Sequence, residues 1–366
     1  MLTFKNLKRI KDVNWFVVSI IVLISCVGLM MQYSAAGGSF SPWVIRQVPR
    51  LGVGIVLMLL IAASPLKFWF NKSYIFYILT VILLVVVELM GYVGMGAQRW
   101  ISFGFFNLQP SELVKFSLIL ALSRYFSHAT YEEMGRLRYL AIPVILILVP
   151  AFLILRQPDL GTAVLVLASG FIVFFLAGLR VWKIFLGFIL VGASLPILWH
   201  VLHDYQRQRV LTFLDPERDP LGAGYHILQS KIALGSGGFW GKGFMHGTQS
   251  YLNFLPEKQT DFIFTMLCEE FGMFGGLVLI SLYMILLFYG YAIMAKSRSP
   301  FSKFLSLGIT SILFLYMFIN IAMVTGLLPV VGIPLPLVSY GGTQLMTLLM
   351  GLGLLMCCDL HATARL

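Results

Sequence analysis

Long apolar runs separated by short polar segments dominate the pattern of this chain. Ten runs are long enough for an α-helix to cross the hydrocarbon core of a bilayer, which takes about 20 residues. They cover approximately residues 14–34, 48–66, 73–93, 110–126, 137–155, 161–178, 182–201, 262–293, 303–327 and 341–358. Because a membrane helix satisfies its own backbone hydrogen bonds, the pattern predicts an all-α integral membrane protein, a polytopic bundle of about ten transmembrane helices. The first run lacks a small-residue cleavage site, so we expect an anchor and not a cleaved signal peptide.

The composition supports this prediction. Hydrophobic residues make up 59% of the 366 residues and charged residues only 11%, which is not typical of a soluble domain. The four cysteines, Cys26, Cys268, Cys357 and Cys358, lie in or beside apolar runs, with neither metal-ligand spacing nor a disulfide pattern. We interpret them as small buried hydrophobic residues.

The distribution of Lys and Arg predicts the orientation of the helices. With the N-terminus inside the cell, 15 of the 26 basic residues lie in cytoplasmic segments and only four in the short outer loops. We therefore expect both termini in the cytoplasm. The net charge of +11 then reflects this topology and attraction to anionic membrane lipids. It does not indicate nucleic-acid binding, because the basic residues form no stripe on a soluble domain.

One connection, approximately 202–260, is much longer than the others, and a loop of that length is usually functional. We expect it outside the membrane, between the seventh and eighth helices of a single domain that spans residues 1–366. Within it, Tyr225 to Leu234 is mildly amphipathic and predicts a short interfacial helix. The glycine-rich stretches 235–238 and 241–243 could approach a ligand closely.

Unusual polar residues gather, on this topology, at the outer ends of the helices. They are Glu88, Arg99, Glu112, Lys115, Asp159 and Asp261. In the inner half, the chief charged candidates within helices are Glu269 and Glu270. An ionisable group in or beside hydrocarbon is costly to keep and is a functional-site hypothesis by default. The pattern therefore places the chemistry at the extracytoplasmic face.

Each candidate also has a purely structural interpretation. Glu112 and Lys115 share one helical face, either as a salt bridge between helices or as the lining of a polar cavity. Asp159 follows a proline and could simply cap a helix. Arg99 could be an interfacial side chain that snorkels to water. Asp261 could begin the eighth helix, whose dipole would keep it ionised, or lie in a poorly hydrated cavity that raises its pKa.

Six motifs in sequence order carry a family resemblance. They are Gly96-Ala-Gln-Arg-Trp100; Gln109-Pro-Ser-Glu112 with Lys115; Gln157-Pro-Asp-Leu-Gly-Thr162; Gln229-Ser-Lys-Ile-Ala-Leu-Gly-Ser-Gly-Gly238; His246-Gly-Thr-Gln249 with Phe254-Leu-Pro-Glu-Lys-Gln-Thr-Asp-Phe-Ile-Phe264; and Pro334-Leu-Pro-Leu-Val-Ser-Tyr-Gly-Gly342. With these motifs the chain resembles the SEDS membrane proteins (shape, elongation, division and sporulation) over nearly its whole length. The stretch 247–257 is more similar to the elongation branch than to the division branch.

The resemblance implies a ten-helix fold and a peptidoglycan glycosyltransferase of the bacterial cytoplasmic membrane. Such an enzyme polymerises lipid II into β-1,4 glycan strands at the outer face during cell elongation. It works with a class B penicillin-binding protein, a transpeptidase, within the elongation machinery. The family's essential aspartate corresponds to Asp261. Polar residues of the family's cavity correspond to Arg99, Glu112, Lys115 and Asp159.

Chemistry adds two expectations to this resemblance. The leaving pyrophosphate needs cationic stabilisation in a poorly hydrated site. The candidates are Arg99, Lys115, Arg207, Arg209 and Lys242. A divalent cation, Mg²⁺ or Mn²⁺, held by carboxylates could do the same. Two other functions stay open from the residues alone: a flippase or other transporter of polyprenyl lipids, and a scaffold for a transpeptidase without activity of its own.

Overall fold

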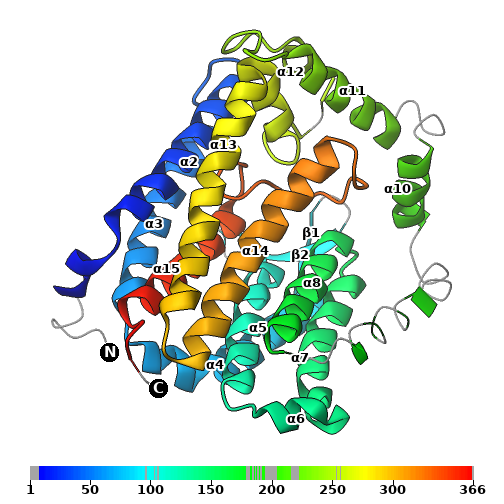
Figure 1. Cartoon of the computed structure of the whole chain (residues 1–366). Coiled ribbons are helices and arrows are strands. Elements are labelled where there is room, and N and C mark those ends of the chain that lie inside the picture. Colours follow the sequence, from blue (N-terminus) through cyan, green and yellow to red (C-terminus); the bar gives the residue numbers. More distant parts are fainter. Residues whose placement is uncertain are drawn as a thin grey trace.

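The protein is a bundle of long α-helices, shown in Figure 1 as a computed structural model. The structure describes residues 8–94, 97–102, 104, 107–178, 182, 183, 185, 187, 189, 192, 193, 204–215, 222–252, 254, 255 and 257–364.

Nine of the ten expected membrane segments are helices in the described part of the chain. They are α2 (Trp15–Ala35), α3 (Trp43–Ala63), α4 (Leu66–Met90), α5 (Pro110–Phe126), α7 (Leu137–Arg156), α8 (Leu160–Leu176), α13 (Ile263–Lys296), α14 (Pro300–Val324) and α15 (Gly342–Leu360). Seven of them, all except the 17-residue α5 and α8, are long and apolar enough to cross a membrane. The prediction of a polytopic all-α fold is confirmed. The expected segment 182–201 lies largely outside the described residues.

The bundle has two distinct ends. At one end the short helix η1 (Lys8–Asp12) meets the end of α15, where Arg9 lies 2.6 Å from Nε2 of His361. The short helix α6 (Tyr131–Gly135) lies at the same end, and α11 and α12 lie at the other (Figure 1). Because both η1 and the end of α15 lie opposite α11 and α12, the structure agrees with a topology that places both chain ends on one side.

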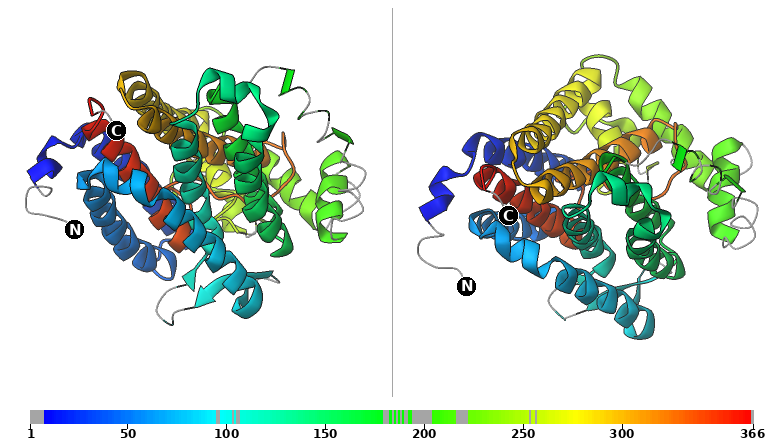
Figure 2. Two further views of the ribbon diagram at one scale, coloured as in Figure 1. Left: turned by 90° about the horizontal axis from the view of Figure 1, so that it is seen from below. Right: turned by 60° about the horizontal axis from the view of Figure 1, so that its bottom comes forward.

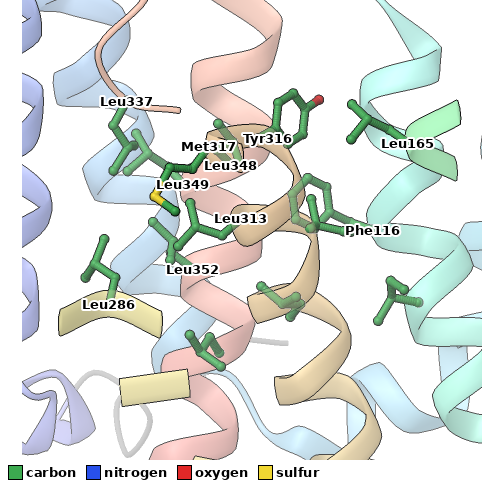
Figure 3. Close-up of a cluster of buried hydrophobic side chains, with 14 of the residues drawn as sticks. Phe116, Leu165, Leu286, Leu313, Tyr316, Met317, Leu337, Leu348, Leu349 and Leu352 are labelled. Atoms are coloured by element: carbon green, nitrogen blue, oxygen red, sulfur yellow. The ribbon is translucent and has the colours of Figure 1, made fainter. Parts of the chain in front are cut away.

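The core is built around α14 and α15. Both are mostly buried inside the bundle, whereas α3, α4 and α13 expose much of their apolar surface, as helices facing lipid do. Helix α15 packs along α3, and α14 lies between α13 and α5 (Figure 2). Figure 3 shows Leu313 and Met317 of α14 close to Leu349 of α15, with Phe116 of α5 nearby.

A small antiparallel sheet follows α4 where the sequence predicted only a loop. Its strands are β1 (Tyr92–Gly94), β2 (Ala97–Ser102) and β3 (Asn107–Leu108), in the order β1-β2-β3. The sequence predicted no strand in this connection between two membrane helices. The sheet matters for the site because β2 carries Arg99.

The long connection contains three helices in its described parts: α10 (Asp204–Leu214), α11 (Ala223–Ser236) and α12 (Thr248–Tyr251). Helix α11 confirms the prediction of a short helix at 225–234. In Figure 1, α10 lies to one side of the bundle and α12 lies over its end. The connection is therefore a folded structure and not an open loop.

The segment that joins α14 to α15 enters the protein interior without forming a helix. Its carbonyl groups accept hydrogen bonds from side chains of several helices: Gln32 to Val338 (3.0 Å), Gln344 to Pro334 (3.1 Å) and Tyr283 to Pro336. Irregular backbone in a membrane protein is tolerated where such partners replace water. The segment is therefore a rigid wall beside the residues that precede α13.

Candidate active site

Asp261 lies in a polar turn just before α13. The helix begins at Ile263 with Phe262 as its N-cap, and no side chain caps it. Asp261 is therefore not a capping residue, and this structural interpretation fails. The residue is half-buried.

Hydrogen bonds from two neighbouring elements hold this turn in place. Asn320 on α14 donates to the backbone carbonyl of Asp261 (2.9 Å). The hydroxyl of Ser339 donates to the carbonyl of Thr260 (2.6 Å), and the backbone N–H of Tyr340 donates to the carbonyl of Gln259 (2.9 Å). Three successive carbonyls are therefore fixed, which preorganises the Asp261 side chain that they carry.

The surroundings of Asp261 favour its protonated form. The pKa of Asp261 is raised to about 7, chiefly because of burial and also because of the negative charge of Glu257, while the positive charge of Arg209 acts in the opposite direction. A carboxyl with a pKa near the working pH is suited to general base catalysis, because it is a stronger base than an ordinary aspartate and about half of it is still ionised at pH 7. Of the two alternatives for Asp261, the direction of the shift agrees with poorly hydrated surroundings and not with a carboxylate kept ionised by the helix dipole.

Arg99 and Asp159 form a second polar group. The Nε atom of Arg99 lies 3.9 Å from Oδ2 of Asp159 and donates to the carbonyl of Gln157 (3.2 Å). Asp159 also caps α8, because Oδ1 accepts from the backbone N–H of Thr162 (3.1 Å). The capping interpretation of Asp159 is therefore confirmed, and the ion pair exists in addition to it.

The segment 331–332 connects this group with Asp261. A Cβ atom added at Gly161, in the first turn of α8, would lie 2.8 Å from the carbonyl oxygen of Val331. A Cβ added at Gly332 would lie 3.5 Å from Oδ2 of Asp261. The start of α8 and the carboxylate of Asp261 therefore contact adjacent residues of the same segment, so the two polar groups belong to one region.

Glu112 and Lys115 form a closed cluster with Tyr316. Lys115 donates to Oε1 of Glu112 (2.7 Å) and to the hydroxyl of Tyr316, which itself donates to Oε2 of Glu112 (2.8 Å). Lys115 has 0% exposed surface. Glu112 and Lys115 therefore form a salt bridge within α5, and the hydroxyl of Tyr316 connects this pair to α14. A direct contact of this pair with substrate stays a prediction.

The remaining cations differ in their surroundings. Arg207 and Arg209 lie on α10, and the charge of Arg209 reaches Asp261. Lys242 instead pairs with Glu269 (2.9 Å) and donates to Thr248 (2.8 Å). Its contact with a pyrophosphate stays a prediction.

We expected Glu269 and Glu270 in the half of the bundle that is away from Asp261, but both lie at the same end as Asp261, beside the end of the long connection. Glu269 accepts from the backbone N–H of Gln249 (2.9 Å), and Glu270 accepts from that of Met245 (3.1 Å). Both carboxylates therefore anchor the end of the long connection to α13. The glycines 237 and 241 serve this contact, because an added Cβ at either would lie 2.1 Å from a carbonyl oxygen of α13. They approach backbone, where we had expected a ligand.

The sequence left open a divalent cation, Mg²⁺ or Mn²⁺, held by carboxylates. In the described part of the chain, no group of three or more His, Cys, Asp or Glu residues is placed to hold a metal ion. Glu257 and Asp261 are close enough for their charges to interact. Carboxylate oxygens are ligands that Mg²⁺ prefers, and Mg²⁺ usually completes its shell with water and substrate phosphates. The carboxylates of Glu257 and Asp261 are the kind of ligand that such an ion takes.

Asn320, Tyr316 and Ser339 were not among the predicted site residues. Of these three residues, only Asn320 could have been found from the sequence, because it is the one asparagine within the apolar run 303–327. A buried amide in such a run needs hydrogen-bond partners.

Comparison with known proteins decides the family. The FtsW/RodA/SpoVE model of cell cycle proteins matches residues 9–364. The chain belongs to this family, the SEDS proteins. It is 45% identical to the peptidoglycan glycosyltransferase MrdB of Escherichia coli K12 over 343 residues, which cover 93% of this chain and 92% of MrdB.

Solved structures agree with the elongation branch. A chain from a structure of a peptidoglycan synthase complex that coordinates polymerization and crosslinking superposes with a TM-score of 0.82 at 32% identity, covering 94% of this chain and 97% of that one. The rod shape determining protein RodA of Thermus thermophilus superposes with a TM-score of 0.73 at 26% identity, covering 96% and 98%. Family membership, the hydrophobic helices and the fold make this chain a multi-pass membrane protein of the RodA type.

Proposed function

We propose that this chain is a peptidoglycan glycosyltransferase that polymerises lipid II during cell elongation, with Asp261 as the general base. The observation that carries the proposal is the carboxyl of Asp261 on a turn that hydrogen bonds from Asn320, Ser339 and Tyr340 hold in place. Its pKa, raised to about 7, agrees with the role of a base. The family membership and the similarity to MrdB support the activity. Lipid II carries its pyrophosphate at the membrane surface, which is the depth of this site in the proposed orientation.

In this mechanism Asp261 accepts the proton of the 4-hydroxyl of the acceptor GlcNAc. The oxygen forms a bond to the anomeric carbon of the donor MurNAc. The bond from that carbon to the phosphate oxygen breaks, and undecaprenyl pyrophosphate leaves with the electron pair. One displacement inverts the α-linked donor to the β-1,4 product.

The charge that develops on the pyrophosphate needs cations nearby. Arg209 is suited because its charge already reaches Asp261, and Arg207 lies on the same helix. Arg99 lies at the other side of the 331–332 segment, in its ion pair with Asp159. A divalent cation at Glu257 and Asp261 would add positive charge at the same place.

A lipid transporter is the second candidate and has less support. A transporter of this kind would be expected to place charged groups near the bilayer midplane or at both faces. Here Arg99, Asp159, Glu269 and Asp261 belong to one end of the bundle. A scaffold without activity would not require a carboxyl whose pKa is tuned towards neutrality.

The partner belongs to the same proposal. A chain of a peptidoglycan synthase complex has this fold. We therefore infer that a class B penicillin-binding protein binds this chain and cross-links the strands, with both chain termini in the cytoplasm and Asp261 facing outside.

The test is glycan polymerisation from purified lipid II by the protein co-purified with its transpeptidase. Asp261→Asn keeps the shape of the side chain and removes the base. Asp12→Asn, an exposed change at the opposite end, is the matched control. We expect glycan ladders from wild type and control, and at least a 100-fold lower rate from the variant. Equal ladders from a folded, partner-bound Asp261→Asn would remove Asp261 from the chemistry.

A further inference from the structure

A cavity of about 400 Å³ lies next to the turn that carries Asp261, since Lys258 and Met266 are among its walls. It lies between the connection from α2 to α3, helix α12 and the first turns of α13. Its walls include Ser34, Ser41, Trp43, Tyr251, Lys258 and Glu270. Its volume falls within the range of roughly 300–1,000 Å³ that small-molecule sites occupy.

The cavity lies within reach of the proposed chemistry. Lys258 is three residues before Asp261, so their Cα atoms lie at most about 11 Å apart. The carboxylate of Asp261 lies beside Gly332, whereas Lys258 and Met266 line the cavity. A molecule made of linked rings could therefore occupy the cavity with one unit and reach Asp261 with the next.

The walls combine aromatic and polar groups. Trp43 and Tyr251 offer aromatic faces, and Ser41 and Lys258 offer hydrogen-bonding groups. Ser34 instead donates to Oε1 of Glu270, whose Oε2 accepts from the backbone N–H of Met245. The charged side chains are one lysine and one glutamate, so the two formal charges balance. Burial lowers the pKa of Lys258, which indicates a poorly hydrated wall.

This lining discriminates between the parts of a lipid-linked saccharide. A polyprenyl chain would take the charges of Lys258 and Glu270 out of water without offering them a polar group, at a cost in free energy. A pyrophosphate would face the carboxylate of Glu270. A sugar ring has an apolar face that packs on aromatic side chains and hydroxyl groups that pair with serine and lysine.

We propose that this cavity binds GlcNAc or MurNAc units of the glycan, adjacent to the units that react at Asp261. The proposal rests on the proposed function, since it names the part of the substrate that the site holds beyond the reacting bond. The units can come from lipid II itself or from the growing strand. Both present the same amino-sugar rings, and the two sources affect different measurements.

Binding of a soluble tetrasaccharide of alternating β-1,4-linked GlcNAc and MurNAc is measured first. The method is saturation-transfer NMR on the detergent-solubilised complex. Tyr251→Ala is the main variant, because Tyr251 is 58% exposed and its removal does not threaten folding. Trp43→Ala is the second variant. Trp240→Ala, on a residue that is 73% exposed and outside the cavity walls, is the matched control.

We expect about tenfold weaker binding for both cavity variants and unchanged binding for Trp240→Ala. Equal binding by wild type and both variants overturns the proposal, whatever the polymerisation assay shows. Because binding is measured without turnover, its outcome is separate from that of the proposed function.

Polymerisation from lipid II then separates the two sources. If the cavity holds the growing strand, the variants make shorter strands at an unchanged KM for lipid II. If it holds lipid II, KM rises about tenfold at an unchanged strand length. Both results support the cavity as a sugar site, and unchanged KM and strand length in folded variants argue against it.

Discussion

The side-chain amide of Asn320 donates a hydrogen bond to the backbone carbonyl of Asp261 (2.9 Å), although 59 residues separate them in the sequence. The same nitrogen donates to the carbonyl of Ile333 (2.7 Å). One amide on α14 therefore ties the turn before α13 to the segment that follows α14. The position of the proposed base depends on a residue that does not touch substrate.

Replacing Asn320 by Ala should lower kcat at least tenfold, because the turn that carries Asp261 loses its link to α14. Two buried carbonyls also lose their donor, at about 1–3 kcal/mol each, so the thermal midpoint should fall. Polymerisation rate and thermal unfolding are measured together. Ser311→Ala on the same helix is the control, because its hydroxyl bonds only to Leu307 in the preceding turn. A folded Asn320→Ala with unchanged kcat would contradict the positioning role.

The pKa of about 7 for Asp261 predicts how the rate depends on pH. The base must be ionised to accept a proton, so kcat/KM should rise about tenfold per pH unit below 7 and level off above it. Removing the charge of Glu257 with Glu257→Gln should move the inflection to lower pH. Arg209→Gln should move it to higher pH. Shifts in the same direction for both variants, or none, would refute the assignment of the inflection to Asp261.

The same pKa also makes the free energy of unfolding depend on pH. It should fall as pH rises, whereas the reaction rate should increase. The folded protein holds the Asp261 proton up to about pH 7, whereas an unfolded aspartate loses it near pH 4. Between these values the folded state binds more protons, so the free energy of unfolding falls as pH rises through this window. Asp261→Asn should remove that part of the pH dependence, which thermal unfolding at pH 5 and pH 8 measures.

The apolar pattern predicted most of the fold and the place of the main candidate. The turn that carries Asp261 could be found because its polar residues stand directly before an apolar run. The sheet over 92–108 was missed because its strands have only two to six residues, too few for a visible alternation.

The depth of Glu269 and Glu270 was misjudged for a different reason. A depth counted along the sequence does not show that residues 237–243 fold back along the start of α13. Gly272 also interrupts that helix with φ of 68°, so the first turns are a separate unit. Contacts of this kind join distant residues and leave no local pattern in the sequence.

The Glu112–Lys115–Tyr316 cluster allows stability and function to be separated. Lys115→Met leaves a buried carboxylate without its partner, which should destabilise the protein by about 3–5 kcal/mol. The double variant Glu112→Leu, Lys115→Met removes both charges and should recover most of that loss. If the cluster only holds α5 to α14, polymerisation recovers with stability. A stable double variant without activity would instead place the pair in substrate binding.

Glu269 should control the order of the segment 244–252 above the site. The carboxylate has 0% exposed surface and accepts hydrogen bonds from Lys242, Thr248 and the backbone N–H of Gln249. Hydrogen bonds to a charged group contribute about 1.5–3 kcal/mol each, so Glu269→Ala should open this segment locally. Hydrogen exchange of its amides should become at least tenfold faster, with little change in α14.

Lys242→Met is a milder variant whose effect on hydrogen exchange can be compared with that of Glu269→Ala. It removes one of the three donors and the opposite charge but leaves the bond from Gln249, so exchange should rise less. Glu132→Gln, an exposed change, is the control. Because Tyr251 lies in the same segment and lines the sugar cavity, Glu269→Ala should also weaken tetrasaccharide binding. Fast exchange without any loss of binding would show that the cavity forms independently of this anchor.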